Sequence, residues 1–139
     1  MDVRERTVIE LPAAIRDQLV EHSVAELPNE ACGLLAGNGR IEYFYPMTNA
    51  DRSSTTYRLD PREQIKVFNE IEDRGWELSG IVHSHTHTEA YPSPTDQAQA
   101  FYPDAYYVLV SLADRERPMI RGFTIRDVEV EEQEVSIEL

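Results

Sequence analysis

The sequence predicts an α+β domain in which helices pack against a mixed β-sheet. Two segments, 12–27 and 61–76, have apolar residues at helical spacing. Two mostly apolar runs, LSGIV at 78–82 and AYYVLVSLA at 105–113, are typical of buried strands. With 139 residues and neither a repeat nor a linker, we expect a single domain spanning residues 1–139.

The chain is expected to open with a strand and a helix. The run TVIEL at 7–11 has the composition of a short strand. The segment 12–27 then begins with Pro12, a residue suited to the first turn of a helix, and ends before Pro28. Its apolar positions are Ile15, Leu19 and Val20.

Two antiparallel strands are expected next, EACGLLAG at 30–37 and RIEYFYPM at 40–47. Between them lies Asn38-Gly39, a dipeptide that favours a hairpin turn. A polar loop at 48–56 leads to a short predicted strand, YRLD, at 57–60.

The second half alternates helices and strands. Pro61 opens the amphipathic helix 61–76, whose apolar residues Ile65, Phe68 and Ile71 fall three apart. The remaining predicted elements are a strand at 78–86, a short helix at 93–101, a strand at 105–113, and closing strands at 118–125 and 128–139.

Composition excludes several functions. Thirteen Lys and Arg stand against 26 Asp and Glu, and a net charge of −13 argues against nucleic acid or an anionic membrane as a partner. No run is long and apolar enough for a membrane span, and the start MDVRERTVIEL lacks the apolar centre of a signal peptide, so we expect a cytoplasmic protein. A single cysteine excludes a cysteine-rich zinc site, and any metal must be bound by histidines and carboxylates.

The stretch HSHTHTEAYPSPTD, from His83 to Asp96, is the candidate for such a site. If the preceding strand continues through it, His83 and His85 point to one face. SPTD has the pattern of a helix start with Ser93 as the cap, so a helix tip can bring Asp96 to the two imidazoles. Two imidazoles and one carboxylate suit Zn²⁺ with a fourth position open for catalysis.

Simpler interpretations stay open for each of these residues. His-x-His in a strand is also typical of a polar edge or of a hydrogen-bonded pair. Ser93 and Asp96 also form a capping box, which we expect to be compatible with a ligand role only if the Asp96 carboxylate turns away from the backbone. His87 is expected to be exposed or to face a substrate, and Cys32 to be a small buried hydrophobe.

A zinc-activated water needs a proton acceptor elsewhere in the chain. Glu30, which heads the apolar run at 30–37, is the candidate general base.

The combined pattern resembles the signature of the JAMM (MPN+) metalloprotease family, H-x-H-x7-S-x2-D with a distant Glu. NEACGLLAG, PMTNADRSSTTYRLDP and DAYYVLVS also resemble the small bacterial branch of that family, as does Thr86 where most members have proline. The resemblance implies the MPN/JAMM (cytidine-deaminase-like) fold, a curved mixed sheet flanked by helices. It also implies that His83, His85 and Asp96 bind zinc, that Glu30 shuttles the proton and that Ser93 helps to hold the oxyanion.

The resemblance further implies a zinc-dependent peptidase or isopeptidase. In the small bacterial branch it would cut after the Gly-Gly tail of a ubiquitin-like sulfur-carrier protein and release cysteine. Two alternatives are a general deconjugating protease for ubiquitin-like tags and a catalytically silent MPN scaffold that binds partners. A homodimer is compatible with the sequence.

Overall fold

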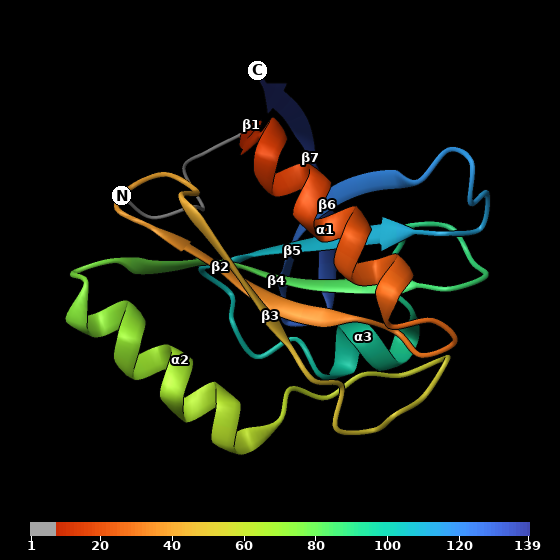
Figure 1. Ribbon diagram of the computed structural model, residues 1–139, viewed down its shortest axis with the longest axis horizontal. Coiled ribbons are helices and arrows are strands. Elements are labelled where there is room, and N and C mark those ends of the chain that lie inside the picture. Colours follow the sequence, from red (N-terminus) through yellow and green to blue (C-terminus); the bar gives the residue numbers. More distant parts are fainter. Residues whose placement is uncertain (1–7) are drawn as a thin grey trace.

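The computed structural model describes residues 8–139 and centres on a curved seven-stranded sheet (Figure 1). The strand order is β1-β7-β6-β5-β4-β2-β3. The strands are β1 (Val8–Pro12), β2 (Cys32–Gly37), β3 (Tyr43–Met47), β4 (Glu77–His85), β5 (Tyr106–Ser111), β6 (Met119–Arg126) and β7 (Glu129–Glu138). The pairs β1–β7 and β4–β5 are parallel and the other neighbours are antiparallel, so the predicted mixed sheet is confirmed.

Helices cover both faces of the sheet. They are α1 (Ala13–Ala25), α2 (Pro61–Asp73) and α3 (Pro94–Ala98). Ile15 and Leu19 of α1 pack in one core cluster with Val82 of β4, whereas Ile71 of α2 packs in a second cluster with Ile81. Because neighbouring side chains of a strand point to opposite faces, α1 and α2 lie on opposite sides of the sheet.

The two longer predicted helices form, with shifted ends. Pro12 is the last residue of β1 and the N-cap of α1, and its ψ of 139° is extended, so the helix begins at Ala13. In α2, Phe68 and Ile71 face the core as predicted, but Ile65 is 64 % exposed. A spacing of three residues drifts by about 60° at each step, which carries Ile65 to the edge of the apolar face.

The predicted hairpin of 30–37 and 40–47 is confirmed as the antiparallel pair β2–β3. Its connection is longer than the two-residue turn expected, because β3 begins at Tyr43. The Glu42 amide donates to the Ala36 carbonyl at 2.9 Å, and Gly39 takes the positive φ of 73° that this loop requires.

The strand predicted at 57–60 is wrong, since this segment contributes only the isolated bridge between Asn49 and Leu59. The helix predicted at 93–101 is shorter and covers Pro94–Ala98. Residues 1–7, which include the first residue of the predicted opening strand, lie outside the described part of the chain. Within residues 8–139, no helix is long and apolar enough to cross a membrane.

Candidate metal centre

The two histidines lie at the end of β4, a central strand of the sheet. Alternation along the strand places His83 and His85 on the same face as Ile81, toward α2 and α3. Both are buried, with 1 % and 5 % of their surface exposed. The predicted convergence of the two rings is therefore observed, and their Nε2 atoms lie 3.3 Å apart.

The tip of α3 brings Asp96 to the two rings. Asp96 Oδ2 lies 3.1 Å from His83 Nε2 and 3.0 Å from His85 Nε2. The same oxygen accepts a hydrogen bond from the Ser93 backbone amide at 2.9 Å, while Ser93 Oγ accepts from the Asp96 amide at 3.0 Å. The carboxylate has therefore not turned away from the backbone, and the oxygen that accepts from Ser93 is also the one that faces the two rings.

The three side chains have the donor set and spacing of a metal site. One ligand atom from each of His83, His85 and Asp96 lies within 4.8 Å of the others. His85 Nδ1 donates to the Glu89 carbonyl at 2.8 Å, and this fixes the tautomer that turns the lone pair of Nε2 toward the shared centre. Two nitrogen ligands and one oxygen ligand suit Zn²⁺ with a fourth position left open.

The charges of the group also suit a metal ion. Burial lowers the pKa of His83, so this ring stays neutral. Burial also lowers the pKa of His85, but its contacts with Asp96 and the Glu89 carbonyl outweigh this and raise the pKa above its ordinary value. A metal ion would compete with the proton that His85 binds at Nε2. Burial raises the pKa of Asp96, but its hydrogen bonds with both rings are decisive and hold the pKa well below the ordinary range, so the carboxylate is ionised.

Glu30 lies beside these residues, at the entry to β2. Cys32 pairs with His83, and the Ser84 amide donates to the Ala31 carbonyl at 3.0 Å. Continuing this register by two residues brings Glu30 near His85, and the electrostatic coupling of Glu30 to His85 and Asp96 agrees with this placement.

The carboxyl of Glu30 is unusual for a group in the interior. The residue is 3 % exposed, and Oε1 has no hydrogen-bond partner among residues 8–139. Burial raises the pKa of Glu30 to about 8; the neighbouring His85 opposes this rise and Asp96 adds to it. A carboxyl with a pKa this close to neutrality can both accept and deliver a proton.

The remaining candidates are not part of the metal-binding group, although Cys32 pairs with His83 across the two strands. His87 is exposed, as expected, and its Nδ1 contacts Thr86 Oγ1 at 2.8 Å. Cys32 is fully buried in the core, as expected, and burial raises the pKa of its thiol to about 12.

Sequence reasoning missed three contacts of the group. They are the Glu89 carbonyl that orients His85, the Tyr57 ring stacked on His83, and the Asn49 side chain that donates to the Glu30 carbonyl at 3.0 Å. A backbone carbonyl leaves no signal in the sequence. The sequence placed Asn49 in a polar loop and Tyr57 in a short strand without a role at the site, because the role of each depends on contacts between distant segments.

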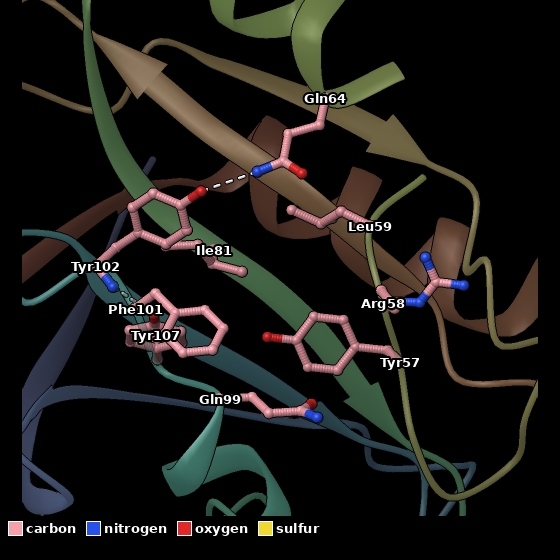
Figure 2. Close-up of a pocket in the computed structure, with 9 residues that line it drawn as sticks. All are labelled: Tyr57, Arg58, Leu59, Gln64, Ile81, Gln99, Phe101, Tyr102 and Tyr107. Atoms are coloured by element: carbon pink, nitrogen blue, oxygen red, sulfur yellow. Dashed lines mark hydrogen bonds between the residues drawn. The ribbon is translucent and has the colours of Figure 1, made fainter. Parts of the chain in front are cut away.

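A cavity of about 220 Å³ adjoins the metal-binding group, and Tyr57 borders both (Figure 2). Figure 2 shows aromatic rings on two sides of it, with the Tyr57 hydroxyl pointing inward. Its lining consists of Tyr57, Arg58, Leu59, Gln64, Ile81, Gln99, Phe101, Tyr102 and Tyr107.

Comparison with known proteins identifies relatives along most of the chain. Residues 12–126 match Prok-JAB, the prokaryotic homologs of the JAB domain. The "CysO-cysteine peptidase" of Mycobacterium tuberculosis is 47 % identical over 133 residues, which cover 94 % of this chain and 91 % of that protein. The "Desampylase" of Haloferax volcanii is 32 % identical over 111 residues, covering 74 % and 80 %.

A solved structure shows the same architecture. The solution structure of a protein from Desulfitobacterium hafniense superposes with a TM-score of 0.85 at 36 % identity, covering 94 % of this chain and 92 % of that one. The family match, the relatives and the curved mixed sheet agree with the resemblance that the histidine motif indicated. The chain belongs to the family of prokaryotic JAB (JAB/MPN) domain proteins.

Proposed function

We propose that this protein is a zinc-dependent peptidase that cuts after the Gly-Gly tail of a ubiquitin-like sulfur-carrier protein and releases cysteine. The observation that carries the proposal is the buried carboxyl of Glu30, with a pKa raised to about 8, beside a group of two histidines and one aspartate that can hold a metal. The choice of substrate rests on the relative that is 47 % identical and is named CysO-cysteine peptidase.

In this proposal His83, His85 and Asp96 hold the zinc. A bound zinc ion supplies Lewis acidity toward water and toward the carbonyl of the scissile bond. Glu30 accepts a proton from the attacking water and delivers it to the nitrogen of the leaving cysteine as the C–N bond breaks. In the metal-free protein burial raises the pKa of Glu30 to about 8, and a zinc ion bound nearby would favour the ionised form that accepts the first proton.

Ser93 has the geometry to assist at the developing oxyanion. Its Oγ accepts from the Asp96 amide, and the hydrogen of the hydroxyl therefore remains available for donation. We assign Ser93 to hydrogen-bonding the oxyanion, in a place that the cap of α3 holds fixed.

The aromatic cavity favours a substrate whose reacting segment is slim and extended. It adjoins His83 through Tyr57, and its volume of about 220 Å³ is ample for two glycine residues. A Gly-Gly tail passes such a space without a steric conflict. The tail, a homodimer and a cytoplasmic location stay predictions.

A second candidate is a deconjugating protease that cuts isopeptide bonds to a ubiquitin-like tag. The relative from Haloferax volcanii named desampylase favours it. A silent scaffold is less well supported, because the chain keeps Glu30, His83, His85, Ser93 and Asp96 in one place.

The test is an intact-mass assay on a sulfur carrier that ends in Gly-Gly-Cys. The zinc-loaded protein should remove one cysteine residue, and a chelator or the Glu30→Gln substitution should abolish the loss. A carrier joined to a lysine through an isopeptide bond serves as the second substrate. Cleavage of this conjugate alone would favour the deconjugating protease, and cleavage of neither substrate by protein shown to hold zinc would contradict both assignments.

A further inference from the structure

The two histidines of the metal-binding group are held in different ways. His85 is oriented by the hydrogen bond from its Nδ1 to the Glu89 carbonyl. His83 is 1 % exposed, and its Nδ1 has no hydrogen-bond partner among residues 8–139. A metal-binding histidine ordinarily donates its second ring N–H to a fixed acceptor, which sets the rotation of the ring. The rotation of His83 must therefore be set by packing.

Tyr57 provides that packing. Its ring lies flat against the imidazole of His83, with centroids 4.3 Å apart and an angle of 17° between the planes. The Tyr57 hydroxyl points into the aromatic cavity (Figure 2). The face of the ring, rather than the hydroxyl, thus restricts His83.

Tyr57 is itself held firmly, although it lies outside any strand. Asn49 donates through Nδ2 to the Thr56 carbonyl at 2.9 Å and accepts through Oδ1 from the Arg58 amide at 3.2 Å. These bonds fix the backbone on both sides of Tyr57. Asn49 is 4 % exposed, and its Nδ2 also donates to the Glu30 carbonyl at 3.0 Å. One amide side chain therefore ties the loop that carries Tyr57 to the segment that carries Glu30.

We propose that Tyr57 is a positioning residue for His83: its ring face holds the imidazole in the rotation that points Nε2 at the centre shared with His85 and Asp96. This inference rests on the proposed metal site. Tyr57 acts through His83 and needs no contact with the metal or with the reacting atoms.

The test compares zinc affinity in Tyr57→Phe and Tyr57→Leu by competition with a chromogenic chelator. Tyr57→Leu removes the aromatic face and should weaken zinc binding by about 10–100-fold, the range found when the partner that orients a ligand is removed. Tyr57→Phe keeps the face and should bind zinc as the wild type does. Phe101→Leu, which changes another aromatic residue of the same cavity, is the matched control and should leave zinc affinity unchanged.

A spectroscopic measurement separates positioning from a general loss of packing. The absorption spectrum of the Co²⁺-loaded protein reports ligand geometry, and it should change in Tyr57→Leu and stay unchanged in Tyr57→Phe. The unfolding free energy of each metal-free variant shows whether the variant is folded. If Tyr57→Leu does not fold, the ring protons of His83 in the wild type decide the matter, because stacking on Tyr57 predicts an upfield NMR shift.

Three results would overturn the inference: wild-type zinc affinity in folded Tyr57→Leu, an equal loss in Tyr57→Phe, or unshifted His83 ring protons. Its failure is distinguishable from failure of the proposed function. A wild-type protein that binds no zinc removes the metal site and the inference together. If the wild type binds zinc and Tyr57→Leu binds it with the same affinity, only the role of Tyr57 is removed.

Discussion

Replacing Glu30 by Gln is expected to stabilise the metal-free protein at alkaline pH and to have little effect near pH 4.5. The carboxyl is 3 % exposed, and burial raises its pKa from 4.5 to about 8. The folded protein therefore favours the protonated form of Glu30, and ionisation of this carboxyl lowers the free energy of unfolding. Gln has the same shape and stays neutral at every pH, so it escapes this cost.

The size and the pH range of the effect follow from the pKa values. Because the folded pKa lies above the unfolded one, the wild type has its full stability from this residue below pH 4.5 and loses it progressively up to about pH 8. Each pKa unit corresponds to about 1.4 kcal/mol, so the difference between variant and wild type should reach about 3 kcal/mol at pH 7 and about 5 kcal/mol above pH 8.

Urea unfolding of chelator-treated protein, followed by the fluorescence of Trp76, measures this difference at each pH. Titrating groups that do not interact with Glu30 cancel in the subtraction, whereas His85, whose pKa is raised in part by Glu30, contributes to the difference. A difference that stays constant between pH 4.5 and 9 would refute the view that Glu30 is a buried, uncompensated carboxyl. With zinc bound, the same variant should keep its metal and lose turnover.

Three further substitutions test the site and its support. Asp96→Asn removes the charged ligand. Zinc affinity, measured by chelator competition, should fall by more than the about 10–100-fold that is typical when a residue orienting a ligand is lost. Unchanged affinity would exclude Asp96 as a ligand. Ser93→Ala removes the cap of α3 and should cost about 1 kcal/mol in urea unfolding. It should also lower kcat by about 10²–10³ if Ser93 serves the oxyanion, whereas Ser93→Thr should restore both. Asn49→Ala breaks buried hydrogen bonds to several backbone groups and should destabilise the fold by about 2–4 kcal/mol; a loss below about 0.5 kcal/mol would contradict its role in holding the loop.

The sequence predicted the elements whose signal is local. The apolar run before the histidines became the central strand β4, and its alternation correctly placed His83 and His85 on one face. The pattern SPTD gave the cap of α3, because capping depends on residues within one turn. Helix ends were less accurate, since a cap such as Pro12 is decided by the backbone on both sides of it.

The segment 57–60 shows why a correct pattern can give a wrong element. Tyr57 is half-buried and Leu59 is buried, while Arg58 between them is exposed, which is the alternation of a strand. The backbone pairing stops at the bridge with Asn49 and the bond from the Ala50 amide to the Arg58 carbonyl, because the Arg58 amide donates to the Asn49 side chain instead of to a neighbouring backbone. Periodicity reports which side chains face inward, but it does not report what the backbone bonds to.

The surroundings of Glu30 show how the fold holds a carboxyl that must exchange protons. The Glu30 amide donates to the Ser53 carbonyl at 2.8 Å, its carbonyl accepts from Asn49, and the next amide, that of Ala31, donates to Ser84 Oγ at 2.8 Å. The backbone is therefore fixed at three points, while Oε1 has no hydrogen-bond partner in the described part of the chain. A strong hydrogen bond to the carboxylate would have stabilised the ionised form and lowered its pKa. By fixing the backbone instead of the carboxyl, the fold places this group accurately and keeps its pKa near neutrality, and the stability lost at alkaline pH is the consequence.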